Sequence, residues 1–219
     1  MTAAGPGQAP ASGPPRPAQR SRAARADALR NRARLLEAGS AAFAEHGEAT
    51  SLEDVARRAG VGIGTLYRHF PTRDALVEAV YRSTVDSLCD DADELLAALP
   101  PGEALAEWMR RYVGYVATKR GMASAVKSIL RANSSFFDDY RRRLGEAAGR
   151  LLRAAADSGE VRSDVDAGEL LRAIHGICLA ADASHQLAQS LPLVGLLLDG
   201  LRYGATGPAG EQRRAGPAG

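Results

Sequence analysis

The sequence is poor in cysteine and in long apolar runs, and each shortage excludes a class of protein. Its 219 residues include two cysteines, Cys89 and Cys178, too few for a disulfide scaffold or a cysteine-rich metal site. The longest apolar run, Leu191–Leu198, falls well short of the roughly 20 residues of a membrane-spanning helix. The first residues offer Pro, Gly and Ala where a signal peptide needs an apolar segment. We therefore expect a cytoplasmic protein with no membrane partner.

Aromatic residues are also scarce, at 5% of the chain, whereas hydrophobic residues make up 45%. The core must therefore be built mainly from Leu, Ala and Val, and runs of β-branched residues are few. Ala, Leu and Arg are strong helix formers, so the composition favours an all-α fold. The helical period of the apolar residues predicts about nine helices, at approximately 27–46, 51–60, 63–70, 72–100, 103–118, 122–132, 136–158, 167–188 and 192–203.

Lysine is nearly absent, and the charges are unevenly distributed along the chain. Residues 1–73 contain eleven arginines and six acids, a net charge of +5, whereas residues 74–219 have a net charge of −3. Codon bias explains arginine in place of lysine, but it does not explain why the acids lie elsewhere. The asymmetry indicates that the N-terminal third of the chain meets a polyanion.

Both ends of the chain are rich in Pro, Gly and Ala and show no apolar period. We expect residues 1–26 to form a disordered basic arm and residues 204–219 a disordered tail. The arm carries Arg22 and Arg25, which suit contacts to DNA phosphates or entry into a minor groove. The alternative is a solvated tail with no fixed partner.

The most informative segment is Ser51–Phe70, which reads SLEDVARRAGVGIGTLYRHF. Ser51 and Asp54 have the spacing of a capping box, which opens a short helix. Gly60 provides the permissive backbone of a tight turn, and a second short helix follows at 63–70. This pattern is typical of a helix-turn-helix unit, whose second helix enters the major groove of DNA. Spacing alone leaves open an ordinary helical hairpin.

The second helix of this unit has side chains that suit DNA. Ile63, Leu66 and Phe70 are predicted to face inward. A methyl group such as that of Thr65 can contact thymine, and the guanidinium of Arg68 can donate to guanine. The remaining candidates act on phosphates or allow close approach of the backbone. The full predicted DNA-binding set is Ser51, Gly62, Gly64, Thr65, Tyr67, Arg68, His69, Arg73, Arg22 and Arg25.

The same segment closely resembles the DNA-binding domain of TetR/AcrR-type transcriptional regulators. Their hallmark GTLYRHF-like stretch stands here at 64–70, and the resemblance extends from about Ala28 to Asp86. The sequence departs from the family pattern at Gly62 and Ile63. The resemblance implies a helix-turn-helix DNA-binding domain at residues 27–86, with its motif at 51–70, followed by a helical ligand-binding and dimerisation domain at residues 87–203.

The resemblance also implies a function. It implies a homodimer that binds double-stranded DNA at a palindromic operator and responds to a small organic effector, more often as a repressor. No cofactor or catalytic residue is expected, because the sequence contains no HExxH motif and no phosphate-binding glycine loop before a lysine. A small-molecule carrier with a non-functional helix-turn-helix is the remaining alternative.

Large residues in the second half of the chain define a candidate effector site. A pocket lined by aromatic residues and Met suits a small apolar ligand, although ordinary core packing uses the same residues. The resemblance favours a pocket between the helices at 103–118 and 167–188. The predicted ligand-binding set is Trp108, Tyr112, Tyr115, Met122, Ile129, Phe136, His175, Cys178, Leu179 and Asp182.

Four polar residues lie along one stripe of the helix predicted at 167–188, namely His175, Cys178, Asp182 and His185. A transition-metal sensor would use such residues, but the two histidines lie about 15 Å apart along the helix axis. We therefore assign no metal and interpret the stripe as a polar seam.

The helices at about 167–203 are predicted to form the dimer interface. The first is rich in Ala and Gly, which permit close helix approach, and the second contains the apolar run LPLVGLLLDGL at 191–201. Two such helices from each subunit would make a twofold-symmetric contact. Packing within a single chain is the alternative.

Overall fold

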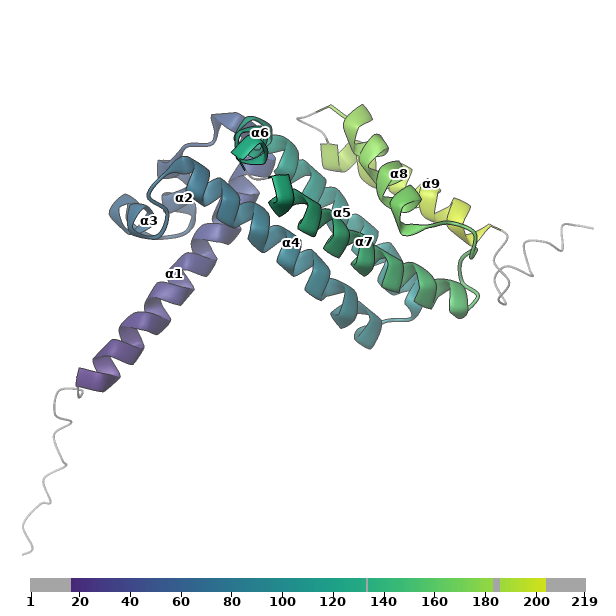
Figure 1. The fold of residues 1–219 in the computed structure, drawn as a ribbon, viewed down its shortest axis with the longest axis horizontal. Coiled ribbons are helices and arrows are strands. Elements are labelled where there is room, and N and C mark those ends of the chain that lie inside the picture. The colour runs from purple at the N-terminus through teal and green to yellow at the C-terminus, as the bar shows by residue number, and fades with distance from the viewer. Residues whose placement is uncertain (1–16, 133, 183–185, 204–219) are drawn as a thin grey trace, which may run out of the picture.

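The computed structural model describes residues 17–132, 134–182 and 186–203, and within these ranges the chain is helical with no β-strand (Figure 1). The prediction of an all-α fold with about nine helices is confirmed for this part of the chain. The elements are α1 (Pro17–His46), the 3₁₀ turn η1 (Gly47–Ala49), α2 (Leu52–Arg58), α3 (Ile63–His69), α4 (Arg73–Ala98), α5 (Pro101–Gly121), α6 (Ala123–Ala132), α7 (Ser134–Asp157), α8 (Ala167–Ala180) and α9 (Gln186–Arg202).

The first helix begins ten residues earlier than the sequence pattern predicts. The expectation of a disordered arm at 1–26 is wrong for residues 17–26, which are the first turns of α1. Pro17 fits the first position of a helix, since its missing N–H has no partner there in any case. The Ala and Arg residues that follow are strong helix formers. Residues 1–16 and the predicted tail at 204–219 lie outside the described residues.

The last two helices also differ from the prediction, because α8 ends at Ala180 rather than near residue 188. The guanidinium of Arg120 donates to the carbonyl oxygens of Cys178 and Ala181, at 3.4 and 2.8 Å. It thereby provides partners for carbonyl groups that the end of a helix leaves unpaired. The final helix, α9, begins at Gln186. It therefore starts six residues before Pro192, the residue at which the sequence pattern places its start, and contains this proline in its interior.

Helix α5 forms the centre of the fold and packs against α1, α4, α7, α8 and α9. Trp108 of α5 is fully buried, and its indole N–H donates to the carbonyl oxygen of Leu88 in α4 at 2.7 Å. The Trp108 ring stacks on Tyr112, with the centroids 5.5 Å apart. One turn further along, the hydroxyls of Tyr115 and Tyr81 lie 2.9 Å apart and share a hydrogen bond. These contacts join α4 and α5 along their length.

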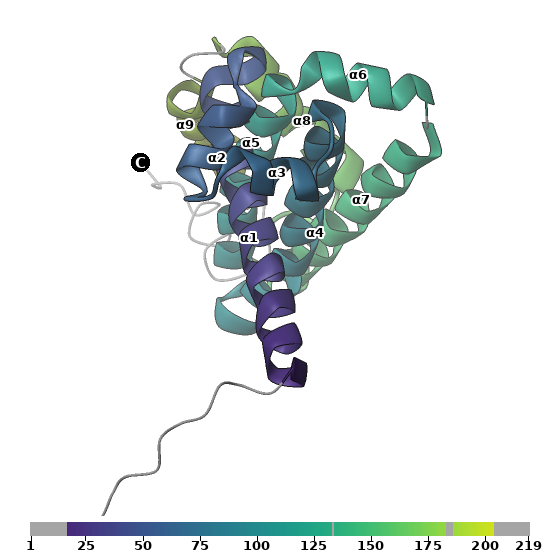
Figure 2. The ribbon, with the colours of Figure 1, turned by 90° about the vertical axis from the view of Figure 1, so that its left-hand side faces the viewer.

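The short helices α2 and α3 lie at one end of the molecule, and α8 and α9 lie at the other (Figure 1). Viewed from the first end, α3 faces the viewer and α1 extends away from the body of the molecule (Figure 2). Among the described helices, none combines the length and hydropathy needed to cross a bilayer.

Candidate DNA-binding surface and ligand-binding core

The α2–turn–α3 unit is formed by a helix cap, a glycine turn and a few buried side chains. The Ser51 hydroxyl accepts the backbone N–H of Asp54 at 3.0 Å, so the predicted N-terminal cap of α2 is present. Gly60 adopts a φ of +64°, the left-handed region that glycine enters without a steric cost. Val55 and Leu66 are fully buried, and α2 packs against both α3 and α1. The segment therefore has the geometry of a helix-turn-helix.

Ionic contacts fix α2 to the end of α1. Arg58 donates to the carboxylates of Glu45 and Asp54, each at 2.7 Å, and its guanidinium also lies 2.7 Å from the His46 ring nitrogen. The hydrogen bond from Arg58 lowers the pKa of Glu45, which holds this carboxylate in its charged form. Glu45 and His46 are exposed to solvent and Arg58 and Asp54 are partly covered, so the contacts orient the helices more than they stabilise the fold.

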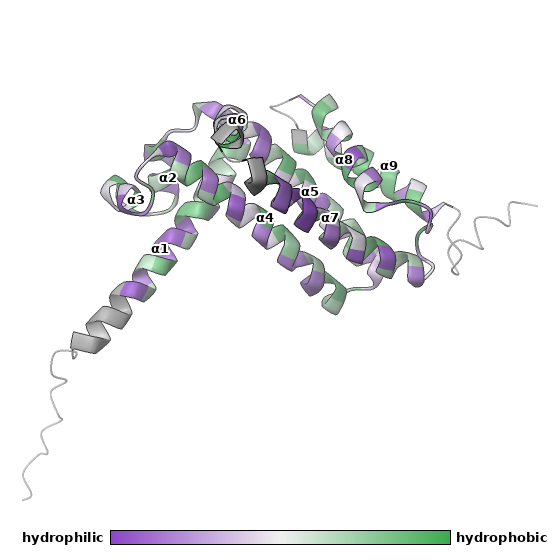
Figure 3. Ribbon diagram, in the orientation of Figure 1, coloured by the Kyte–Doolittle hydropathy of each residue, from purple (hydrophilic) through white to green (hydrophobic). Residues whose placement is uncertain are grey.

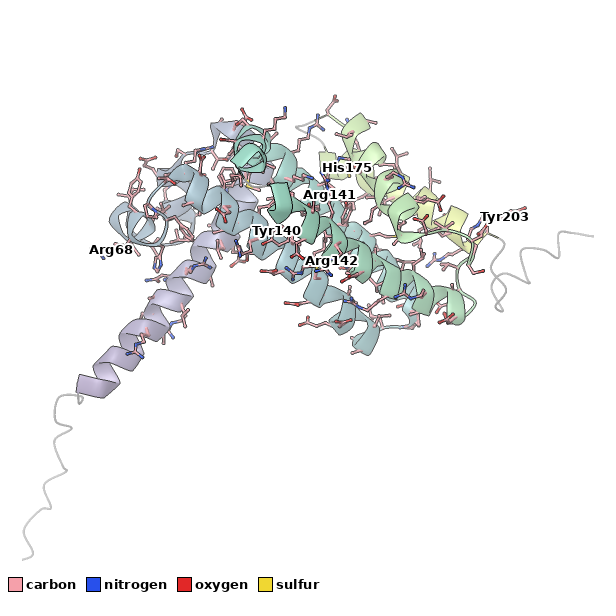
Figure 4. The ribbon with its side chains drawn as sticks, in the orientation of Figure 1. Arg68, Tyr140, Arg141, Arg142, His175 and Tyr203 are labelled. Atoms are coloured by element: carbon pink, nitrogen blue, oxygen red, sulfur yellow. The ribbon has the colours of Figure 1, made fainter. Side chains whose placement is uncertain are left out.

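The outer face of α3 presents polar side chains and open backbone. Arg68 points away from the molecule (Figure 4), and it makes no ion pair with any residue that the structure describes. The Tyr67 side chain is 46% exposed. A Cβ atom added at Gly62 or Gly64 would meet nothing within 4 Å, so another molecule can approach this backbone closely. Thr65 and His69 are half-buried at the edges of the same face.

Ile63 differs from its predicted position. It was expected to face the core with Leu66 and Phe70, which are indeed buried, but Ile63 is 37% exposed at the first position of α3. The first side chains of a helix can lie beyond the surface of the neighbouring helix against which the later residues pack. The helical period of the sequence does not show which side chains these are. Ile63 is thus an apolar residue on the face that bears Tyr67 and Arg68, where it can contact a thymine methyl group.

Arg73 also differs from expectation, because its charge is used within the protein. Its guanidinium donates to the carbonyl oxygens of Glu48, at 3.0 Å, and Thr50, and it lies 5.3 Å from the Phe43 ring centroid. These contacts fix the start of α4 to the turn before α2. We therefore interpret Arg73 as a positioning residue for the DNA-binding unit.

The two arginines of the predicted arm lie on α1. Arg25 is exposed, whereas the side chain of Arg22 lies outside the described residues. A helical α1 places these residues at fixed intervals along one rod, which extends beyond the DNA-binding unit (Figure 2).

The predicted effector residues of α5 are brought together in the core. Trp108, Tyr112, Tyr115 and Met122 are all buried, and Ile129 of α6 is half-buried against them. Burial raises the pKa of Tyr112 and that of Tyr115, so both phenols are neutral near pH 7. Phe136 belongs to α7, but its side chain lies outside the described residues.

The predicted residues of α8 separate into two groups. Cys178 is buried and His175 is half-buried on the side that faces α5. Leu179 is 61% exposed on another face, and Asp182 is exposed beyond the helix end, where its backbone N–H donates to the Gln189 side chain at 2.8 Å. The structure therefore does not place Leu179 and Asp182 with the buried cluster, because consecutive helix positions point about 100° apart.

The polar stripe on α8 is only partly described, because His185 lies outside the described residues. Within those residues, no three His, Cys, Asp or Glu side chains gather closely enough to hold a metal ion.

A separate groove of about 720 Å³ lies between α1, α4 and α5. It includes Ser40 and Leu36 of α1 and Thr84 of α4, and Tyr115 is the predicted ligand residue that lines it.

Sequence reasoning missed Lys119, which lies on the same face of α5 as Tyr112. The two residues are seven positions apart, which is close to two helical turns. Burial lowers the pKa of the Lys119 ammonium, and Arg141 lowers it further. Lys119 is one of only two lysines in the chain, and this rarity was the available signal.

The helix-turn-helix with its exposed α3 defines a DNA-binding protein, and comparison with known families gives the particular family. Residues 35–80 match the family of bacterial regulatory proteins called tetR, and residues 100–203 match the C-terminal domain of SbtR-like transcriptional regulators. The chain belongs to the TetR family and is a DNA-binding transcriptional regulator. The family consists of transcriptional regulators.

Solved structures and curated relatives support this assignment. The TetR transcriptional regulator SCO0520 from Streptomyces coelicolor is 44% identical, with a TM-score of 0.72, over 80% of this chain and 99% of that chain. A TetR regulator from Mycobacterium vanbaalenii is 39% identical, with a TM-score of 0.63, over 82% of this chain and 99% of the other. The transcriptional repressor KstR2 of Rhodococcus jostii is 29% identical over 143 residues, which make up 62% of this chain and 70% of that protein.

Proposed function

We propose that this protein is a cytoplasmic, homodimeric repressor that is released from a palindromic operator by a small organic effector. In this proposal residues 27–86, extended by the earlier turns of α1, form the DNA-binding domain. Residues 87–203 form the effector-binding and dimerisation domain. The observation that carries the proposal is the exposed outer face of α3, with Arg68 and Tyr67 directed outward from a rigidly packed helix-turn-helix.

The DNA contacts follow from this geometry. We place α3 in the major groove, with Ile63, Thr65 and Arg68 at base edges and the open backbone at Gly62 and Gly64 against the sugar-phosphate chain. The Tyr67 hydroxyl and the His69 ring donate to phosphates at the groove edge. The start of α2 at Ser51 adds backbone N–H groups beside a phosphate. The exposed arginines of α1, including Arg25, add a contribution to affinity that does not depend on DNA sequence.

Dimerisation is assigned to α8 and α9, because these helices expose apolar side chains that a monomer would leave in water. The exposed leucines are Leu179, Leu187, Leu191, Leu193 and Leu196. Hydrophobic residues along both helices can be followed in Figure 3. Gly176, Gly195 and Gly200 have no neighbouring atom within 4 Å of an added Cβ, so a second helix can approach closely. A twofold contact here would give a dimer with two α3 helices, one for each half of a palindromic operator.

Effector binding is assigned to the aromatic core around Tyr112, and its effect on DNA binding requires a rigid connection to α2 and α3. Such a connection exists where the end of α5 meets the end of α1. A Cβ added at Gly121 would lie 1.8 Å from the carbonyl oxygen of Phe43, so the two backbones are in direct contact. Beside it, the Glu48 carboxylate accepts the backbone N–H of Ser124 in α6 at 3.0 Å. Thr72 caps α4, whose start adjoins α3, and provides the second connection.

The test of the proposal is selection of DNA from a random library, followed by binding to the enriched sequence at several salt concentrations. We expect a palindrome bound by a dimer, with half-sites at least about 34–36 Å apart and affinity that falls steeply with salt. If no sequence is enriched, the repressor proposal fails. Binding would then reflect charge alone, as expected for a carrier whose helix-turn-helix has lost its function.

A further inference from the structure

We propose that the effector is an organic anion, with its acidic group held between Lys119 of α5 and His175 of α8 and its apolar body against Tyr112. This inference rests on the proposed function, because it names the chemical class of the effector for the same core. It is carried by three features of the described residues: a half-buried lysine without an acidic partner, a tyrosine hydroxyl that makes no hydrogen bond within the protein, and an adjacent aromatic wall.

Lys119 provides the first feature. Its ammonium group has no ion pair and no hydrogen bond with any described residue, although the side chain is mostly covered. An ammonium withdrawn from water normally has a carboxylate partner, since an unpaired buried charge is costly. The last turn of a helix does favour a cation, but an exposed lysine would gain the same benefit. Lys119 therefore lacks the negatively charged partner that an ammonium in this environment normally has.

His175 and Arg141 reach the same region from two other helices. Lys119 acts electrostatically on His175 and lowers its pKa, after burial of the ring, and Arg141 acts in the same way on Lys119. Arg141 of α7 and His175 of α8 can be located in Figure 4. Asp138 pairs with Arg141 at 3.4 Å, but both of these side chains are largely exposed. Lys119 and His175 thus belong to two helices that pack against each other, α5 and α8, and neither makes an ion pair with any residue that the structure describes.

Tyr112 provides the second feature. The residue is 6% exposed, yet its hydroxyl has no hydrogen-bond partner among the described residues. The hydroxyl is not one of the fully buried polar atoms that lack a partner in the described residues, so water or a ligand can reach it and hydrogen-bond to it. Tyr112 lies about 10 Å from Lys119 along the helix axis, at 1.5 Å per residue. Its hydroxyl is thus available to an oxygen on the body of a ligand whose acidic group is at Lys119.

The aromatic wall lies on the Tyr112 side. The Tyr112 ring packs 5.5 Å from Trp108 and 5.3 Å from Tyr115, measured between centroids. Ring faces of this kind accept flat or ring-containing apolar groups. A molecule that is apolar along its length and acidic at one end matches both parts of the site. A fully neutral molecule would leave Lys119 without a partner.

The experiment compares two fluorescent probes that differ by one acidic group. Anilinonaphthalene sulfonate is an anion, and N-phenylnaphthylamine is the same ring system without the sulfonate. We expect Lys119→Met to raise the dissociation constant of the anionic probe by about 5- to 20-fold and to leave that of the neutral probe unchanged. The matched control is Lys127→Met, which removes the other lysine, an exposed residue of α6, and should change neither constant. Equal effects on both probes, or none, would overturn the proposal.

A second measurement uses the wild-type protein, so it does not depend on how a variant folds. Reductive methylation with carbon-13 formaldehyde labels Lys119, Lys127 and the N-terminal amine, which are few enough to resolve by NMR. The anionic probe should shift the Lys119 signal and not that of Lys127, and an unmoved Lys119 signal would also overturn the inference. Neither the probe titrations nor the NMR measurement requires DNA. Failure of the DNA selection would therefore remove the repressor proposal without affecting these readouts.

Discussion

The two ends of the molecule expose different kinds of side chain. At the α3 end, the exposed residues are mainly polar or glycine, and the apolar side chains Leu66 and Phe70 are buried. At the α8–α9 end, five leucines are exposed on two helices. A polar, arginine-bearing face remains stable in water until it meets DNA, whereas a row of exposed leucines lowers its free energy only by contact with another apolar surface. This difference fits the proposal that DNA binds at one end of the molecule and a second copy of the chain at the other.

The largest effect should come from placing a charge on the α9 face. Leu196 is 67% exposed, so Leu196→Asp should fold normally as a monomer but should bury an unpaired carboxylate in the dimer. We expect the dimer dissociation constant to rise at least about 30-fold and operator affinity to fall with it. Analytical ultracentrifugation measures the first change. The control is Leu29→Asp, at a residue of α1 that is 70% exposed, and this variant should remain dimeric. If Leu196→Asp also remains dimeric, the dimer interface does not include this face of α9.

The connection between the two ends can be tested at Gly121. Its added Cβ would lie 1.8 Å from a backbone oxygen that cannot rotate away, so Gly121→Ala must separate the end of α5 from α1. We expect a loss of about 1–3 kcal/mol in the free energy of unfolding, measured by urea denaturation. Gly114→Ala, on the same helix with nothing within 4 Å, should be neutral or stabilising. An equal response of the two variants would contradict the direct contact.

At the α3 end, Arg68 should affect DNA binding without affecting stability. Arg68 is exposed and makes no ion pair with a described residue, so Arg68→Ala should leave the melting temperature unchanged. We expect a loss of about 1–3 kcal/mol in operator binding and relaxed specificity at the base pair it contacts, measured on a set of operator variants. Arg110→Ala, an exposed arginine of α5, is the control. Uniform weakening across all sequences would instead indicate a phosphate contact.

The smallest expected effect is a dependence of the melting temperature on pH, caused by His175, which is half-buried on the side of α8 that faces α5. Burial, aided by Lys119, lowers the pKa of His175 below its ordinary value of 6.5. The unfolded chain therefore binds a proton at a pH where the folded chain does not, and His175 destabilises the protein as the pH falls below about 6.5. The melting temperature of the wild type should accordingly fall relative to that of His175→Gln between pH 7.5 and 5.5. A constant difference would contradict the lowered pKa.

The sequence by itself determined the local elements whose signals are short-range. The helical period predicted about nine helices, and the predicted cap at Ser51 correctly placed the start of α2. Gly60 marked the turn, because a positive φ excludes most other residues. The GTLYRHF segment pointed to the family for the same reason, since a helix-turn-helix depends on contacts within about twenty residues.

Only the tertiary structure decided which side chains are available. Arg73 and Arg68 are both arginines near α3, yet one is bonded to the carbonyls of Glu48 and Thr50 and the other is free to bind DNA. Leu179 and Cys178 are neighbours in the sequence, yet one is exposed and the other buried. The last carbonyl groups of α8 accept hydrogen bonds from Arg120, which is 58 residues away from its acceptor at Cys178. Contacts between residues far apart in the chain decide burial, and burial decides whether a charge binds a partner, remains in water or requires a ligand.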